Sequence, residues 1–302
     1  MASATSSHEE NQYLDLVRRV IDLGQHRPDR TGTGTRSLFA PPQLRFTLTD
    51  STLPLITTKR VFTKAIIHEL LWFIRGSTCS LDLSSKGVNI WNGNGSKAYL
   101  TSVGLGHRDE GDLGPVYGFQ WRHFGAQYLT CHDDYTGQGV DQLKECIQKI
   151  IHKPTDRRII LSAWNPSDLT KMALPPCHMF CQFYVTLPDE KHLKPRLSCI
   201  LYQRSADIGL GLPFNIASYA LLVHMIAQVT GTEAYELVIQ LGDAHVYNDH
   251  LEPIKTQLER EPKPFPKVKL RKGVIDIDGF VYEDFEIVDY NPHPKIEMAM
   301  SV

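Results

Sequence analysis

The chain has 302 residues, of which 42% are hydrophobic and 22% charged, and its formal net charge is −2. This composition is typical of a globular protein with a sizeable core, and it excludes a polybasic surface as the main contact with nucleic acid or an anionic membrane. The six cysteines form no CxxC pair, and the N-terminal sequence MASATSSHEENQ has neither a basic region nor an apolar segment, so we expect a cytoplasmic protein with free thiols. No apolar run approaches the roughly 20 residues that span a bilayer, the nearest being 216–229, and we expect no membrane partner.

The first part of the chain predicts a leader, a helix, a loop and a strand, in that order. Residues 1–9 are expected to form a disordered leader. Apolar residues at helical spacing then predict an amphipathic helix over 13–24. The segment PDRTGTGTRS, 28–37, has the glycines and hydroxyls of a loop, and alternating apolar residues predict a strand over 44–48.

A second, strongly apolar helix is predicted over 62–75, ending before Gly76. It carries Glu69 in the middle of the sequence HELLWF. This carboxylate is either solvated or buried with a function, and the apolar run 70–74 that follows favours burial. The next stretch, 87–138, is rich in glycine, aromatic and polar side chains, and we expect loops there that carry functional groups.

The second half of the chain mixes predicted helices with predicted strands. Periodicity predicts helices over 140–152 and 216–229, and strands over 159–163, 180–185, 197–203 and 237–241. These runs do not alternate as regular βαβ units, so we predict an α+β fold with a single domain over 10–302.

Two prolines lead directly into Cys177, in the sequence ALPPCHMFCQFYV. Pro175 and Pro176 fix φ and lack backbone donors, so a stiff, extended entry should present the thiol at the edge of a strand. A free cysteine often only fills space in a core, and a packing role stays open beside a nucleophilic one. A nucleophile would need cationic neighbours, because only a few per cent of an ordinary thiol is ionised at neutral pH.

Four arginines stand in turns or at strand ends, namely Arg30, Arg157, Arg158 and Arg204. The planar guanidinium suits bidentate capture of phosphate, so several arginines converging on one point would imply a phosphate monoester. For any one of them alone, a surface ion pair is the simpler interpretation.

Three further polar residues fit a nucleotide. His245 and Tyr247 would project to the same side of an extended segment, where they suit a sugar hydroxyl. Asn215 offers a donor and an acceptor on one side chain, which matches the edge of a pyrimidine, although a helix N-cap is an equally good role for it.

Other chemistries have less support in the sequence. There is no GxGxxG and no Walker A motif, which disfavours nucleotide binding of the Rossmann or P-loop type. Cys177, His178 and Cys181 lack the second ligand pair that structural zinc requires, and we expect no metal. A cysteine hydrolase with a distant histidine partner stays open.

Ten segments of the chain, in the same order, resemble the thymidylate synthase family. They are DRTGTGT, TTKRVF, ELLWFIRGST, GDLGPVYGFQWRHFGA, DRRIIL, AWNPSDL, ALPPCH, LPFNIASYALL, LGDAHVY and YNPHP, and the resemblance covers about 12–302. It implies a methyltransferase that converts dUMP to dTMP, with 5,10-methylenetetrahydrofolate giving the one-carbon unit and the hydride and leaving as dihydrofolate. It also implies a large mixed β-sheet flanked by helices, and a homodimer that forms through the sheet.

The resemblance also implies roles for individual residues. Cys177 would add to the pyrimidine 6-position, in a catalytic group that comprises Cys177, Glu69, Asn215, Tyr117, His178 and Asp207. The nucleotide would be bound by Arg30, Arg204, Ser205, Asp207, Asn215, His245 and Tyr247, and across the dimer by Arg157 and Arg158. The reduced folate would contact Ile90, Trp91, Asn94, Asp207, Leu210, Gly211, Phe214 and Met300.

The sequence departs from the family pattern at three places. Asn92 stands where WDANGS has an acid, Ala206 where RSGD has a glycine, and the segment 186–196 is longer than the usual short turn. A surface insertion is the expected meaning of the extra length.

Two other functions remain as alternatives. A cytosine-nucleotide hydroxymethylase would share the scaffold but would carry an acid in place of Asn215. A regulatory nucleotide- or RNA-binding relative would have lost turnover, and the intact Cys177 and Glu69 argue against it. The sequence gives no indication of RNA binding.

Overall fold

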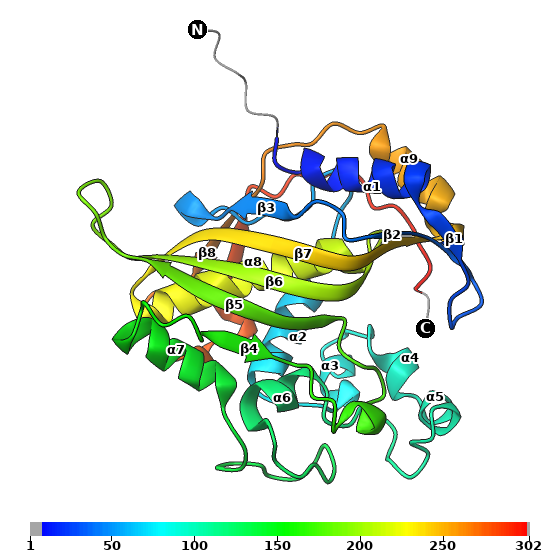
Figure 1. The fold of residues 1–302 in the computed structure, drawn as a ribbon, viewed down its shortest axis with the longest axis horizontal. Coiled ribbons are helices and arrows are strands. Elements are labelled where there is room, and N and C mark those ends of the chain that lie inside the picture. The colour runs from blue at the N-terminus through cyan, green and yellow to red at the C-terminus, as the bar shows by residue number, and fades with distance from the viewer. Residues whose placement is uncertain (1–7, 301–302) are drawn as a thin grey trace, which may run out of the picture.

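The computed structural model describes residues 8–300, which form one main sheet with helices packed around it (Figure 1). The helices are α1 (Asn11–Leu23), α2 (Thr63–Ile74), α3 (Ser80–Ser84), α4 (Asn92–Gly95), α5 (Lys97–Ser102), α6 (Tyr117–His123), α7 (Gln142–His152), α8 (Gly211–Thr230) and α9 (Leu251–Leu258). The strands are β1 (Gln25–Arg27), β2 (Thr35–Phe39), β3 (Leu44–Thr47), β4 (Ile160–Ser162), β5 (His178–Thr186), β6 (Arg196–Asp207), β7 (Glu233–Tyr247), β8 (Lys267–Leu270) and β9 (Phe285–Val288). Short 3₁₀ turns are η1 (Thr49–Ser51), η2 (Leu169–Lys171), η3 (Asn248–His250), η4 (Ile277–Gly279) and η5 (Tyr282–Asp284).

The seven-stranded sheet has the order β1-β2-β7-β6-β5-β4, and β3 pairs with β7 beyond the end of β2. Only β6 and β7 pair in parallel among the described strands, and α8 connects them. This confirms the α+β prediction and the large mixed sheet. A separate two-stranded sheet, β8 with β9, was not predicted from the sequence.

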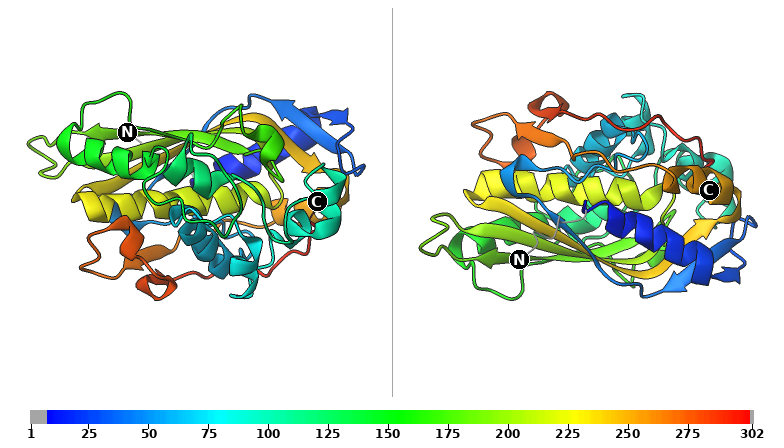
Figure 2. Two further views of the ribbon diagram at one scale, coloured as in Figure 1. Left: turned by 90° about the horizontal axis from the view of Figure 1, so that it is seen from below. Right: turned by 90° about the horizontal axis from the view of Figure 1, so that it is seen from above.

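Helix α8 forms the centre of the molecule. It lies between the main sheet and a second layer that contains α2 and the β8–β9 pair (Figure 2). By length and composition this twenty-residue helix could cross a membrane, so the expectation that no apolar run reaches this length is wrong. Because 72% of its most apolar stretch is buried inside the fold, the helix has the surroundings of a core helix.

The opposite face of the sheet is not covered by any helix of the described chain (Figure 1). On β5, Phe183 points toward α8, while Phe180 and Tyr184 point outward, as the alternating sequence predicts. Tyr184 is 66% exposed, and Phe180 stacks on Tyr202 of β6 with ring centroids 5.7 Å apart. The result is an exposed apolar surface, which we call the open sheet face, formed by Ile160, Phe180, Tyr184, Ile200 and Tyr202.

Strand β7 is three times longer than predicted. The sequence predicts only 237–241, because Glu236 precedes this apolar run and Gly242 and Asp243 follow it. In the structure β6 pairs with β7 from Arg196 opposite Glu233 almost to the end of both strands. This tertiary pairing overrides the local pattern and places the DAHVY sequence within the sheet.

Helix α8 also begins earlier than predicted, at Gly211, so Asn215 lies in its second turn and the N-cap interpretation of Asn215 is wrong. The side chain of Asp207 accepts hydrogen bonds from the backbone N–H groups of Gly209 (2.8 Å) and Leu210 (3.3 Å), just before the helix, and of Gly211 (3.4 Å), its first residue. Pro213 in the first turn is compatible with a helix start, because the first turn has no intrahelical partner for its missing N–H.

Three short helices, α4, α5 and α6, occupy parts of the stretch 87–138 that was expected to be loops. Each is too short to show a helical period in the sequence. The extra length at 186–196 is a surface loop between β5 and β6, as predicted, and its Leu193 is 85% exposed.

The expected leader lies mostly outside the described residues, which begin at His8. His8 packs edge-on against Phe265, with ring centroids 4.6 Å apart. The carboxylate of Glu9 accepts hydrogen bonds from the backbone and the side chain of Thr47. These two residues therefore contact the body of the fold.

Candidate active site

Cys177 lies immediately before β5, and Arg204 of β6 fixes its surroundings. The Arg204 guanidinium donates to the carbonyl oxygens of Pro176 (2.8 Å) and Pro175 (2.9 Å), and its Nη2 lies 3.8 Å from the Cys177 Sγ. The backbone N–H of Arg204 also donates to the Cys177 carbonyl at 2.9 Å. We call this arrangement the arginine clamp. It holds a permanent positive charge beside the thiol, as a nucleophilic cysteine requires.

Charges around the thiol act in opposite directions. Burial raises the pKa of Cys177, while the positive charges of Arg204 and Arg30 lower it and the carboxylate of Asp207 raises it further. The net shift is upward. The neutral thiol is thus the resting form, and the two arginines reduce the cost of forming the thiolate.

A buried wall of aromatic rings supports the same cysteine. The backbone N–H of Cys177 donates to the Tyr117 Oη at 2.7 Å, and the Tyr117 ring stacks on His178 with centroids 4.0 Å apart. The His178 Nδ1 is 2.9 Å from the Tyr219 Oη. Burial lowers the pKa of His178 to about 3, so this imidazole is neutral at physiological pH and can accept or donate a hydrogen bond.

Tyr219 was missed by the sequence analysis. It stands four residues after Asn215 in LPFNIASYALL, a spacing that places both on one side of α8. This spacing is the only sequence signal for a role of Tyr219 beside Asn215. It is informative only together with the position of His178, which faces α8 from β5.

Glu69 of α2 is buried, as its apolar neighbours predicted. Its Oε1 accepts a hydrogen bond from the Trp91 Nε1 at 2.7 Å. Burial raises the pKa of Glu69 to about 7, and the bond from Trp91 opposes that rise. A carboxyl with this pKa exchanges its proton readily near neutral pH, which suits an acid or base in catalysis.

The amide of Asn215 is oriented by a neighbour. The Gln203 Nε2 donates to the Asn215 Oδ1 at 3.0 Å and to the Ser205 carbonyl at 3.2 Å. This contact fixes which end of the Asn215 amide is oxygen, so its donor and acceptor have defined positions. Gln203 was another residue that sequence analysis missed, because its role depends on the position of α8 relative to β6.

Asn94 has an unsatisfied donor. Its side chain is buried, and the Nδ2 has no hydrogen-bond partner among the described residues. Such a group is costly unless a bound molecule or water pairs with it. This fits the expectation that Asn94 faces a ligand.

A polar pocket of about 260 Å³ lies at the ends of β2, β6 and β7. Its lining residues are Arg27, Pro28, Asp29, Arg30, Thr35, Ser205, Asp243, His245 and Tyr247. We call it the strand-end pocket. It unites four residues predicted to contact one nucleotide, namely Arg30, Ser205, His245 and Tyr247.

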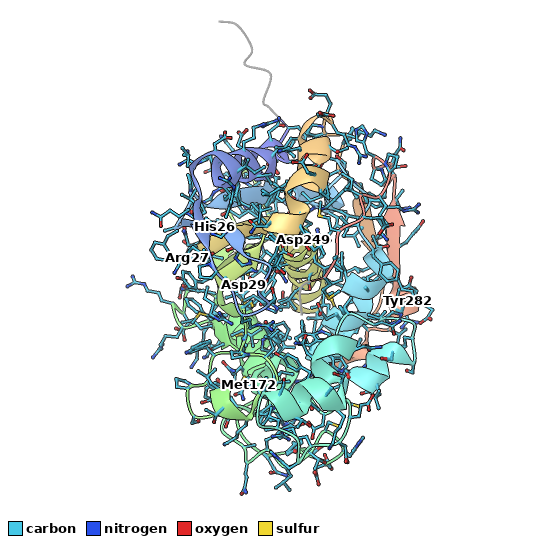
Figure 3. All side chains as sticks on the ribbon, turned by 90° about the vertical axis from the view of Figure 1, so that its right-hand side faces the viewer. His26, Arg27, Asp29, Met172, Asp249 and Tyr282 are labelled. Atoms are coloured by element: carbon cyan, nitrogen blue, oxygen red, sulfur yellow. The ribbon has the colours of Figure 1, made fainter. Side chains whose placement is uncertain are left out.

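His245 and Tyr247 lie on the same side of β7, as predicted, with ring centroids 5.3 Å apart. The Asp243 Oδ1 is 3.1 Å from the His245 Nδ1 and so orients the imidazole. Arg27, which the sequence analysis missed, contributes a further cation. Figure 3 views this end of the molecule, with Arg27 and Asp29 above Met172.

The loop that carries Arg30 is held by one carboxylate. Asp29 accepts hydrogen bonds from the backbone N–H groups of Thr31 (2.8 Å) and Gly34 (2.7 Å). Gly34 has φ of +77°, and a Cβ there would lie 2.5 Å from the Asn248 Nδ2. A side chain at position 34 would therefore be strained and would displace the loop.

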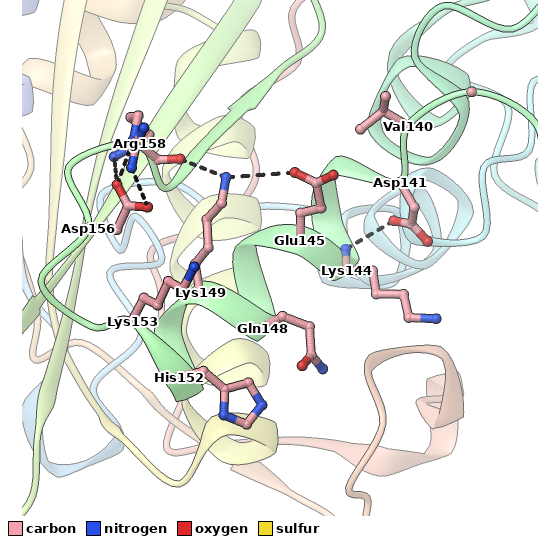
Figure 4. Close-up of a pocket in the computed structure, with 11 residues that line it drawn as sticks. Val140, Asp141, Lys144, Glu145, Gln148, Lys149, His152, Lys153, Asp156 and Arg158 are labelled. Atoms are coloured by element: carbon pink, nitrogen blue, oxygen red, sulfur yellow. Dashed lines mark hydrogen bonds and ion pairs between the residues drawn. The ribbon is translucent and has the colours of Figure 1, made fainter.

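Arg157 and Arg158 are not brought to the strand-end pocket. They precede β4, at the opposite edge of the sheet from β1, and line a separate depression with Lys153 and Pro154. The Arg158 side chain is 85% exposed and pairs with Asp156 at 3.0 Å, beside α7 (Figure 4). Within one chain, the predicted cluster of arginines is thus incomplete.

The expected folate contacts come from separate segments of the chain. Leu210, Gly211 and Phe214 are at the start of α8 next to Asp207, whereas Ile90 and Trp91 precede α4. Met300 is 54% exposed near the end of the described chain. The buried Lys59, which sequence analysis missed, donates to the Gly209 carbonyl close to Asp207.

The two point departures are accommodated locally. The Asn92 Oδ1 accepts a hydrogen bond from the Ser84 Oγ at 2.6 Å, and the Ala206 methyl is buried opposite Ala244 of β7. Across residues 8–300, no group of three or more His, Cys, Asp or Glu side chains is arranged to hold a metal ion.

Comparison with known proteins identifies the family. A sequence profile described as thymidylate synthase matches residues 11–302. The chain is 69% identical to the thymidylate synthase of Agaricus bisporus over 98% of this chain and 100% of that protein, and 65% identical to that of Saccharomyces cerevisiae over 97% of each. It is 57% identical to the thymidylate synthase of Homo sapiens, over 98% of this chain and 91% of the human protein. The motifs around Cys177, the mixed sheet and these matches agree, and the chain belongs to the thymidylate synthase family.

Proposed function

We propose that the site around Cys177 carries out the reaction of this family, the reductive methylation of dUMP to dTMP. The observation that carries the proposal is the arginine clamp, because it holds a cation and a rigid backbone around one thiol. The Cys177 Sγ would bond to C6 of the pyrimidine and so make C5 a carbon nucleophile. C5 would bond to the methylene of 5,10-methylenetetrahydrofolate and then lose its proton as the bond from the methylene to the folate nitrogen breaks. The tetrahydrofolate released in this way would give a hydride to the methylene as the Sγ–C6 bond breaks, which leaves dTMP and dihydrofolate.

Glu69 is the proposed store for the moving protons. Its pKa of about 7 allows it to hold or release a proton near neutral pH, and the bond from Trp91 keeps its carboxylate in place. Tyr117 and His178 complete the buried side, and neutral His178 adds no second positive charge there. We also assign Asp207 and Asn94 to this group of residues, where they would contact the pyrimidine and the folate.

The remaining residues match the three chemical parts of the nucleotide, which are the phosphate, the ribose and the base. We assign the phosphate to Arg30, Arg204 and Ser205, and the ribose hydroxyl to His245 and Tyr247. The uracil edge is assigned to Asn215, whose amide is oriented by Gln203. The folate is assigned to Ile90, Trp91, Asn94, Leu210, Gly211, Phe214 and Met300, together with Asp207.

The active form is proposed to be a homodimer. The open sheet face exposes Phe180, Tyr184 and their apolar neighbours, which a second copy of the chain would bury. A two-fold axis across this face would carry Arg157 and Arg158 of each chain toward the phosphate site of its partner. We also propose one catalytic domain over 10–302 and a cytoplasmic location.

The test is an assay with 5,10-methylenetetrahydrofolate and either dUMP or dCMP, in which absorbance follows dihydrofolate and mass spectrometry identifies the nucleotide product. We expect dTMP and dihydrofolate from dUMP and no product from dCMP. Hydroxymethylated dCMP formed with tetrahydrofolate, and no product from dUMP, would instead identify a cytosine-nucleotide hydroxymethylase, because that reaction adds water in place of the hydride. No turnover with either nucleotide, at concentrations that bind, would favour the regulatory relative and contradict the proposal.

A further inference from the structure

His250, at the end of η3, is a buried histidine that none of the steps above uses. Its ring is fully buried between β7 and the C-terminal part of the chain. The His250 Nε2 is 2.6 Å from the carbonyl oxygen of Ala299. Because a carbonyl oxygen can only accept, this nitrogen must carry a hydrogen and donate it. His250 therefore holds the backbone of a residue 49 positions later in the chain.

The other ring nitrogen faces the loop that caps α8. The His250 Nδ1 has no hydrogen-bond partner among the described residues and lies 3.9 Å from the Asp207 Oδ1. A Cβ placed on Gly209 would lie 2.9 Å from this nitrogen, 3.1 Å from the Asp207 Oδ1 and 3.4 Å from the Met298 Sδ. The imidazole, the Asp207 carboxylate and the C-terminal segment thus meet at the backbone of Gly209.

Residues 289–300 are fixed to the body at several points along their path (Figure 2). The Tyr290 hydroxyl donates to the Ile56 carbonyl at 2.9 Å, and the His293 Nε2 is 2.9 Å from the Glu261 carbonyl. Beyond residue 294, the described hydrogen bonds to the body are those of Met298 with Lys59 (3.9 Å) and of Ala299 with His250. The bond from His250 is thus the last fixed point before the end of the described chain.

We propose that His250 is a positioning residue for the reduced folate, because its Nε2–H holds the segment 298–300 against the Asp207 loop. The inference rests on the proposed function, which places the folate between Asp207 and Met300. When the segment 298–300 closes over the folate, the bond from His250 to Ala299 sets the distance between this segment and Asp207. His250 touches neither substrate in this scheme and acts only through the C-terminal segment.

The test compares His250→Gln with His250→Asn. A glutamine amide can place an N–H where the His250 Nε2 lies, whereas the shorter asparagine amide reaches only the position of Nδ1. Both variants are polar and uncharged, so they differ mainly in reach. The matched control is His293→Asn, which removes a histidine contact to a carbonyl from the same segment, away from Asp207.

Steady-state kinetics and limited carboxypeptidase digestion give the readouts. For His250→Asn, we expect the KM for the folate to rise about tenfold, as the loss of one hydrogen bond predicts, with the Kd for dUMP unchanged. We expect His250→Gln and His293→Asn to stay within about threefold of the wild type. With dUMP and folate bound, the C-terminal residues should be released faster from His250→Asn than from the other proteins.

The opposite results would overturn the inference. Equal folate KM values for His250→Gln and His250→Asn would show that reach to Ala299 does not matter. If the C-terminal residues of His250→Asn are released no faster than those of the wild type, the bond to Ala299 does not hold the segment. Thermal unfolding of each variant shows whether a loss of activity comes from misfolding instead. A wild-type protein without turnover would instead contradict the proposed function, while the digestion would still report on the contact between His250 and Ala299.

Discussion

The buried side of the proposed site and its exposed arginines differ in how far one chain completes them. Glu69 and His178 are buried, hydrogen-bonded and shifted in pKa by their burial. Arg157 and Arg158 lie on the surface, where the Arg158 side chain pairs with Asp156. The groups around the thiol are thus in place within a single chain. In the proposed homodimer, Arg157 and Arg158 would instead act at the site of the partner subunit, so only this part of the proposed site would depend on assembly.

Cys177→Ser should have the largest effect on the buried side. We expect turnover to fall by at least about 10³-fold, because a serine hydroxyl is far less ionised than a thiol. Binding of dUMP should remain, since the arginine clamp is made to proline carbonyls and does not need the sulfur. Calorimetric titration with dUMP checks this. If affinity falls in step with turnover, Cys177 has a structural role.

Subunit exchange tests the exposed side. A Cys177→Ser subunit is mixed with a subunit that carries Arg157→Ala and Arg158→Ala, after mild denaturant allows exchange. If the arginines act across the dimer, each heterodimer has one complete site, and random pairing should restore about a quarter of the wild-type activity. If they act within their own chain, no complete site forms. Background activity despite heterodimers confirmed by native mass spectrometry would reject the shared site.

Glu69 should give the buried side a characteristic pH dependence of stability. Its folded pKa of about 7 exceeds the ordinary 4.5, so between these values the folded protein keeps a proton that the unfolded chain has lost. The free energy of unfolding should therefore fall as pH rises through this window, by about 3 kcal/mol from this group. Glu69→Gln removes the effect. Urea unfolding of both proteins at pH 5 and pH 8, at one protein concentration, measures it, and equal pH dependence would contradict the assigned pKa.

The smallest effect is expected from Arg158→Ala alone. The Arg158–Asp156 pair is solvent-exposed on the arginine side, and such pairs stabilise little. The free energy of unfolding should hardly change, while the KM for dUMP rises. A large loss of stability with no change in KM would place Arg158 in the structural framework.

Sequence reasoning was most successful where function depends on a short segment. The two prolines before Cys177, the apolar run around Glu69 and the alternation on β5 are local patterns, and the structure agrees with each. Tyr219, Gln203 and Arg27 were missed because their partners come from other elements. Their roles follow from how α8, β6 and β1 are brought together, and no local period contains that information.

The boundaries that failed have the same cause. Strand β7 continues past its polar residues because β6 pairs with it along nearly its whole length. At the start of α8, the Asp207 carboxylate, four residues earlier, accepts hydrogen bonds from the backbone N–H groups of Leu210 and Gly211. In both cases a neighbour across the fold decided the conformation of a segment whose own sequence was ambiguous.

The open sheet face has a consequence for how the protein behaves on dilution. If each phosphate site is completed by Arg157 and Arg158 of the partner subunit, a separated chain has no complete site, and specific activity must fall once the protein concentration drops below the dissociation constant of the dimer. Adding dUMP would then pull separated chains together, because it binds the paired form better. A small molecule that covered Phe180 and Tyr184 would inhibit the enzyme without resembling either substrate, and excess nucleotide would oppose it only through this linkage.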